Sequence, residues 1–168
     1  MDSVDQFAAE AERFAQWTSH GTAKGEAAAM EALVRLTHLY VAALELPPAW
    51  DQSLADEPDA MCVADDEWHA IATRCARLPF DAYGEVFDPL QIPPEEPVIG
   101  MLSDDIADIY RDVVTGLRAY HAGRRAQAVW EWRFNFNVHW GKHATGAIRA
   151  LHYWLASRSG SASGSNKR

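Results

Sequence analysis

Two groups of side chains at helical spacing could bind a polar ligand or a metal ion. Asp105, Asp108 and Asp112 recur at intervals of three and four residues, which places three carboxylates along one edge of a helix. His139 and His143 are four residues apart, so their imidazole rings would lie one turn apart on a second helix. Carboxylates and imidazoles are also the common protein ligands of metal ions. These five side chains are the first candidates for a site.

Two further polar residues fall among aromatic side chains. On a helical wheel, Arg133 and Asn137 lie one turn apart inside an arc of Trp130, Phe134, Phe136 and Trp140. A buried guanidinium needs an anionic or carbonyl partner, because an unpaired buried charge strongly destabilises a fold. The pattern therefore predicts that one of the three aspartates pairs with Arg133, and that Arg133→Ala costs several kcal/mol of stability.

The histidine pair lacks the neighbours that known metal motifs require. A glutamate follows the first histidine in the HExxH motif of zinc proteases, whereas Trp140 follows His139 here. A cage that also used Asp66 and His69 would resemble the ferritin-like type, but the two Glu-x-x-His pairs of that type are missing. Four residues instead form a polar strip typical of a solvent-facing helix edge: Glu131, Asn135, His139 and Lys142. The sequence predicts no metal site and no cofactor.

The elements that would position these residues are helices. Apolar residues recur at three-and-four spacing over about 4–20, 25–46, 65–77, 103–122 and 124–156. We expect an all-α fold, an antiparallel bundle of about five helices, with Ser103 as the N-cap of the fourth helix and the last helix at the centre. A Pro-rich irregular segment over 78–97 is predicted to pack on one side of the bundle, and a short strand within it stays open. Residues 1–156 would form a single domain and 157–168 a disordered Ser/Gly-rich tail.

Composition narrows the classes of partner. The net charge of −9 would repel phosphate backbones, so nucleic acid is not expected to bind. The start of the chain has no signal-peptide pattern, and we expect no run of about eighteen apolar residues that could span a membrane. The predicted location is therefore cytoplasmic. Cys62 and Cys75 make neither a disulfide framework nor a metal pair, and Cys75 is expected to be buried.

Three blocks of sequence are distinctive: Phe-Asp-Pro-Leu at 87–90, Glu-Pro-Val at 96–98 with Asp-Asp-Ile-Ala-Asp-Ile-Tyr-Arg-Asp at 104–112, and Trp-Glu-Trp-Arg-Phe at 130–134 with His-Trp-Gly-Lys-His-Ala at 139–144. Together they resemble an uncharacterised bacterial family, domain of unknown function 5063. The resemblance extends from the first helix to about His152 and implies no activity, cofactor or partner. Its blocks coincide with the Asp-rich helix, Arg133 and the His139 region, which indicates a shared site or a shared core.

Two interpretations of function remain. The sequence has no GxSxG elbow, no phosphate-binding loop and no dinucleotide fingerprint, which favours a noncatalytic helical domain that binds another protein. The alternative is an enzyme, or a protein that binds a small ligand or metal, with a polar pocket between the last two helices. Seven residues would form that pocket: Asp105, Asp108, Asp112, Arg133, Asn137, His139 and His143. The oligomeric state does not follow from the sequence.

Overall fold

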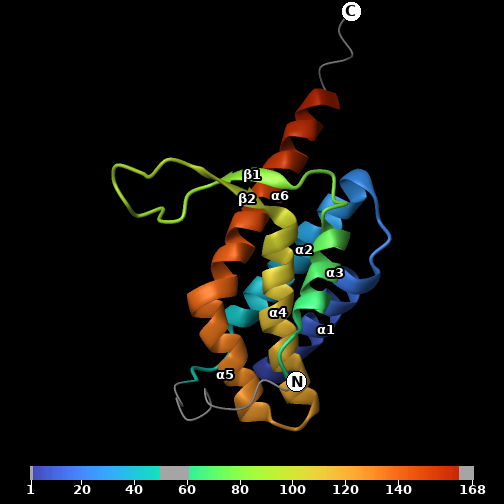
Figure 1. The fold of residues 1–168 in the computed structure, drawn as a ribbon, viewed down its shortest axis with the longest axis vertical. Helices are drawn as coiled ribbons and strands as arrows, with labels where there is room; N and C mark the ends of the chain where they lie inside the picture. Colours follow the sequence, from blue (N-terminus) through green and yellow to red (C-terminus); the bar gives the residue numbers. More distant parts are fainter. Residues whose placement is uncertain (1, 50–60, 163–168) are drawn as a thin grey trace, which may run out of the picture.

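The computed structural model describes residues 2–49 and 61–162 and confirms a mostly helical bundle (Figure 1). Its helices are α1 (Ser3–His20), α2 (Gly25–Leu44), α3 (Asp65–Cys75), α4 (Leu102–His121), α5 (Arg125–Asn135) and α6 (Gly141–Ala162). A π-helical turn, η3 (Phe136–Trp140), joins α5 to α6. Two short strands, β1 (Ala82–Glu85) and β2 (Val98–Met101), pair antiparallel. Between Ala49 and Ala64 the mostly polar and acidic sequence predicts a surface loop, of which residues 50–60 lie outside the described residues.

Helix α4 occupies the centre of the bundle, where the last helix was predicted. It packs against α1, α3, α5 and α6, whereas α6 contacts α2, α4 and the π turn. Large buried side chains of α4 and of three other helices belong to one core: Phe7, Phe14, Leu36, Leu39, Ile106, Ile109, Val113 and Trp132. The apolar stripe of α4 is therefore covered by several helices. These contacts fix the position of its polar edge relative to the neighbouring helices.

The N-terminus of α4 is capped by a residue far away in the sequence. Ser103 was predicted as the N-cap, but the helix begins at Leu102 and Ser103 is buried within it. The carboxylate of Asp81 instead accepts hydrogen bonds from the Ser103 N–H, at 2.8 Å, and from the Ser103 hydroxyl, at 3.1 Å. Asp81 directly precedes β1, so this contact ties the base of the hairpin to the start of α4.

The predicted last helix is continuous but contains the π turn. Trp132, Phe136 and Trp140 are four residues apart and all buried. In a regular α-helix each such step drifts about 40° around the axis, and the wider π turn reduces this drift. Gly141 allows the turn, because a Cβ atom there would lie 2.3 Å from the carbonyl oxygen of Phe136. The π turn thus keeps three large rings on one face.

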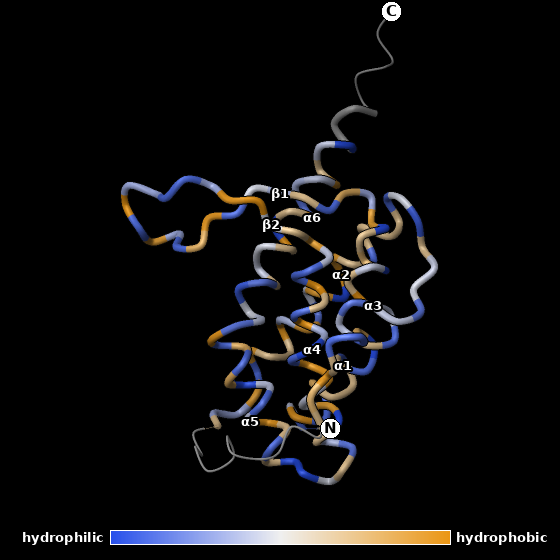
Figure 2. Tube along the Cα trace, in the orientation of Figure 1, coloured by the Kyte–Doolittle hydropathy of each residue, from blue (hydrophilic) through white to orange (hydrophobic). Residues whose placement is uncertain are grey.

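The Pro-rich segment packs against the bundle only at its start, where Leu78 and Phe80 are partly buried against the core; the part between the two strands does not, contrary to expectation. The arm, defined as residues 86–97 between the strands, projects sideways from the bundle (Figure 1), and residues 87–97 are exposed. Phe87, Leu90 and Ile92 are 74%, 87% and 85% exposed. Figure 2 shows both orange and blue stretches along the projecting tube. Strand pairing fixes the two ends of the segment close together, and its prolines prevent it from continuing the ladder.

Two further expectations also change. Helix α6 continues to Ala162, beyond residue 156, because an established helix extends more easily than a new one starts.

Helix α2 is long and apolar enough to cross a membrane by length and composition alone, so the expectation of no such run is wrong. Because α2 packs between α1 and α6 and supplies Leu36 and Leu39 to the core, it also fits the description of a core helix.

Candidate functional site

The three aspartates of α4 face the two histidines of the last helix. Nδ1 of His143 lies 2.7 Å from Oδ1 of Asp105, and Nδ1 of His139 lies 2.7 Å from Oδ2 of Asp112. Between them, Oδ2 of Asp108 lies 3.9 Å from Nε2 of His143. Residues that are early in α4 meet residues that are late in the partner helix, so the two helices run antiparallel here. We call these five side chains the Asp/His cluster.

Helical periodicity explains how the cluster forms. Asp105, Asp108 and Asp112 lie beside the buried stripe of α4, at the edge that meets α6 and the π turn. His139 lies in the π turn and His143 one turn later, with ring centroids 4.8 Å apart. The histidine side chains are 44% and 30% exposed, so the cluster opens toward solvent on one side.

Two of the three carboxylates of the cluster also accept a hydrogen bond from another element of the fold. Trp68 of α3 donates its indole N–H to Oδ1 of Asp108 at 2.8 Å, which leaves Oδ2 directed toward the histidines. Tyr83 of β1 donates its hydroxyl to Oδ2 of Asp105 at 2.6 Å. A chain of hydrogen bonds therefore runs from Tyr83 through Asp105 to His143.

The close approach of Tyr83 to α6 depends on a glycine. A Cβ atom at Gly146 would lie 2.7 Å from the Tyr83 hydroxyl and 2.6 Å from Oε2 of Glu85. Gly146 thus leaves room for the base of the hairpin against α6, one turn after His143.

Burial and charge shape the protonation of the cluster. The hydrogen bond to Asp105 raises the pKa of His143, although burial opposes this shift. Burial raises the pKa of Asp112, although the hydrogen bond with His139 lowers it. Burial also raises the pKa of Glu131, which lies near enough to Asp112 for repulsion between the carboxylates to contribute. The cluster is richer in carboxylates than in cations, so its electrostatic potential favours a bound cation.

Arg133 and Asn137, the other two predicted site residues, lie outside the cluster. Arg133 donates to the carbonyl oxygen of Ala43 at 3.0 Å, at the last turn of α2, and not to an aspartate. The predicted Asp–Arg133 pair is wrong, because the Arg133 side chain is directed to the end of α2 and the two histidines contact the aspartates instead. Asn137 is exposed. The polar strip that was expected to face solvent lies instead at the edge between the helices, through Glu131 and His139.

Sequence reasoning missed Trp68 and Tyr83. Trp68 lies among the apolar residues of the predicted third helix, and this pattern gives no partner for its indole N–H. Tyr83 lies in a segment that was expected to be irregular. Tyrosine and tryptophan carry one polar group on an apolar body, so both commonly find a hydrogen-bond partner when they are partly buried. The residue types therefore indicate that each side chain has a hydrogen-bond partner. Which residue is that partner depends on how α3 and the β1–β2 hairpin pack on α4.

Fold and cluster together define a class: a helical-bundle protein with a histidine–carboxylate cluster between two antiparallel helices. The chain belongs to the family described as "Domain of unknown function (DUF5063)", which matches residues 1–157. It is similar in fold to the crystal structure of protein BF1032 from Bacteroides fragilis, with a TM-score of 0.73 and 23% sequence identity over 89% of this chain and 90% of that chain. Comparison with curated proteins found no match.

Proposed function

We propose that the Asp/His cluster binds one divalent transition-metal ion through His139, His143 and Asp108. The observation that carries this proposal is the position of three ligand atoms, one from each residue, all within 4.8 Å of one another. Two ligands of a tetrahedral ion with bonds of about 2.1 Å lie about 3.4 Å apart. The 3.9 Å between Asp108 Oδ2 and His143 Nε2 is close to that spacing. Small side-chain movements would complete the site.

The outer hydrogen bonds match those of histidine metal ligands. A histidine that binds a metal through one ring nitrogen commonly donates the other N–H to a carboxylate, which fixes the ring and its tautomer. Both histidines make this contact through Nδ1, to Asp105 and Asp112. Nε2 of each ring is therefore the atom left for the metal.

The set of donors indicates the kind of metal. Two imidazoles with one carboxylate suit Zn²⁺, Fe²⁺ and similar ions, whereas Mg²⁺ and Ca²⁺ prefer oxygen ligands throughout. Three protein ligands leave coordination positions for water or a substrate. A metal in such a site lowers the pKa of bound water and polarises a bound oxygen atom. We therefore place the candidate activity in metal-assisted chemistry at the open side of the cluster.

Metal titration of the untagged, chelator-treated protein tests the proposal. We expect Co²⁺, Zn²⁺ and Fe²⁺ to bind at one equivalent, with Co²⁺ giving the absorption bands of a low-symmetry site. His139→Ala and His143→Ala should each lose this binding, while His152→Ala, a change to an exposed histidine of α6, should retain it. Equal binding by all three variants, or no stoichiometric binding by the wild type, would overturn the proposal.

A second candidate is protein binding through the arm. We infer that the arm binds a second copy of the chain, because the same molecule carries both exposed apolar side chains and a hollow of about 450 Å³. Tyr40, Ile148 and Tyr153 give this hollow apolar wall, and Thr37, Thr145, Arg149 and His152 also line it. Self-complementary surfaces of this kind form two-fold dimers. Light scattering should give a dimer mass for the wild type and a monomer mass for Leu90→Asp. A monomeric wild type at high concentration would refute this inference.

A further inference from the structure

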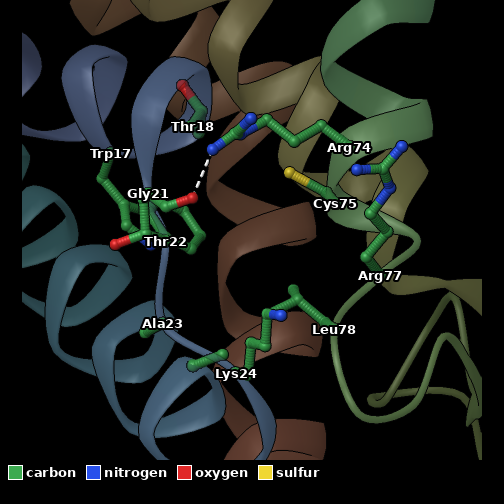
Figure 3. Close-up of a pocket in the computed structure, with 11 residues that line it drawn as sticks. Trp17, Thr18, Gly21, Thr22, Ala23, Lys24, Arg74, Cys75, Arg77 and Leu78 are labelled. Carbon is green, nitrogen blue, oxygen red and sulfur yellow. Dashed lines mark hydrogen bonds between the residues drawn. The ribbon is translucent and has the colours of Figure 1, made fainter.

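A second concave site lies away from the Asp/His cluster, where the connection between α1 and α2 meets the end of α3. It is a cavity of about 480 Å³, within the size range of small-molecule sites. Figure 3 shows the side chains that surround it. Trp17 and Leu78 supply apolar wall, and three cationic side chains, Lys24, Arg74 and Arg77, extend from two sides.

The charge of this cavity is opposite to that of the whole protein. The chain carries a net charge of −9, yet none of the described residues that line the cavity has a carboxylate. Asp81 is close enough to affect the pKa of Cys75, but its oxygens accept hydrogen bonds from Ser103. Three cations around one hollow repel one another unless an anion lies between them.

Two of the three cations have no partner in the described parts of the chain. Arg74 donates to the carbonyl oxygen of Gly21 and thereby connects α3 to the end of α1. Lys24 and Arg77 are exposed, and neither side chain makes a hydrogen bond or ion pair with a described residue. Their donors are available to a ligand.

Other groups around the cavity are compatible with negative charge. Lys24 is also the N-cap residue of α2, and its side chain does not cap the first N–H groups of that helix, whose dipole favours an anion. Burial raises the pKa of Cys75 to about 12, so this thiol stays neutral and adds no repulsion. Thr18 is occupied, because its hydroxyl donates to backbone oxygens of its own helix.

We propose that this cavity binds the phosphate group of a small phosphorylated molecule, with Lys24, Arg74 and Arg77 around the phosphate and the organic part against Trp17 and Leu78. Guanidinium and ammonium groups are the side chains that recognise phosphate, through charge-assisted hydrogen bonds. The volume exceeds that of a bare phosphate ion, which leaves room for an organic group. The proposal is independent of the metal site.

Calorimetric titration with phenyl phosphate and with inorganic phosphate, at constant ionic strength, tests the proposal. We expect saturable binding of both, with phenyl phosphate the tighter ligand. The double variant Lys24→Ala/Arg77→Ala should lose about tenfold or more in affinity, because it removes two donors of charge-assisted hydrogen bonds to the phosphate. Both residues are exposed, so the variant should keep its fold, which circular dichroism checks.

Lys142→Ala is the matched control, since Lys142 is an exposed cation on α6 that does not line the cavity. It should bind both probes as the wild type does. An absence of saturable binding, or equal affinity in the double variant and the wild type, would overturn the phosphate site. Equal affinity for the two probes would overturn the role of the apolar wall.

Discussion

Nδ1 of His143 lies 2.7 Å from Oδ1 of Asp105, whose other oxygen accepts the Tyr83 hydroxyl at 2.6 Å. This carboxylate therefore links an imidazole on α6 to a phenol on β1, although 60 residues separate the histidine from the tyrosine in the sequence (143 − 83). The imidazole ring cannot turn without breaking this contact. The Asp/His cluster is consequently organised before any metal arrives, which reduces the cost of ordering its ligands on binding.

The first prediction concerns the two aspartates that hold the histidines. Asp105→Asn and Asp112→Asn should each weaken metal affinity by about 10–100-fold, because an amide orients the imidazole less strongly than a carboxylate does. Competition with a chromophoric chelator measures this change. Asp104→Asn is the matched control, since Asp104 is exposed on the same turn of α4. If it weakened affinity equally, the effect would come from overall charge and not from orientation.

The second prediction concerns pH and the metal-free protein. The pKa of His143 is raised in the folded state, mainly by its hydrogen bond to Asp105. A raised pKa gives stabilisation that is fully present below the ordinary value of 6.5 and is lost as pH rises through the higher folded-state value. The wild type should therefore exceed His143→Gln in free energy of unfolding by more at pH 5.5 than at pH 8.5, by urea denaturation. A difference that grows toward pH 8.5 would contradict this assignment.

The third prediction replaces the expectation of a large loss at Arg133. Its guanidinium donates to the Ala43 carbonyl at the end of α2 and is only partly buried. Arg133→Ala should cost about 1.5 kcal/mol, the lower end of the range for a hydrogen bond from a charged group, by chemical denaturation. Arg13→Ala, which breaks an exposed pair with Glu10, should cost no more than about 0.5 kcal/mol. Equal losses in the two variants would mean that the contact with α2 adds nothing.

The fourth prediction concerns the π turn. A Cβ atom at position 141 would lie 2.3 Å from the Phe136 carbonyl, so Gly141→Ala forces this turn to change. We expect a loss of about 1–3 kcal/mol in stability, as in other overpacked sites, together with weaker metal affinity, because His139 lies within the turn. Gly84→Ala is the control, since nothing lies within 4 Å of its added Cβ. Unchanged metal affinity in Gly141→Ala would show that the turn does not position the histidines.

The sequence alone was sufficient for the local features. Apolar residues at three-and-four spacing predicted helices close to the observed α1, α3 and α4, because a helix that buries one face must repeat with the period of its turns. The same period placed Asp105, Asp108 and Asp112 on one edge of α4. Family membership was also readable from short blocks, since these depend only on residue identity.

Tertiary structure decided which residues meet across helices. A wheel drawn for one helix pointed Arg133 at the aspartates, but Arg133 contacts the end of α2, and the histidines that follow it in the chain contact the aspartates. The arm and the Tyr83 contact depend on pairing between β1 and β2, which are more than ten residues apart in the chain. Periodicity specifies the direction of a side chain only relative to its own helix axis. Its partner depends on how several helices pack around one shared core, a property of the whole chain.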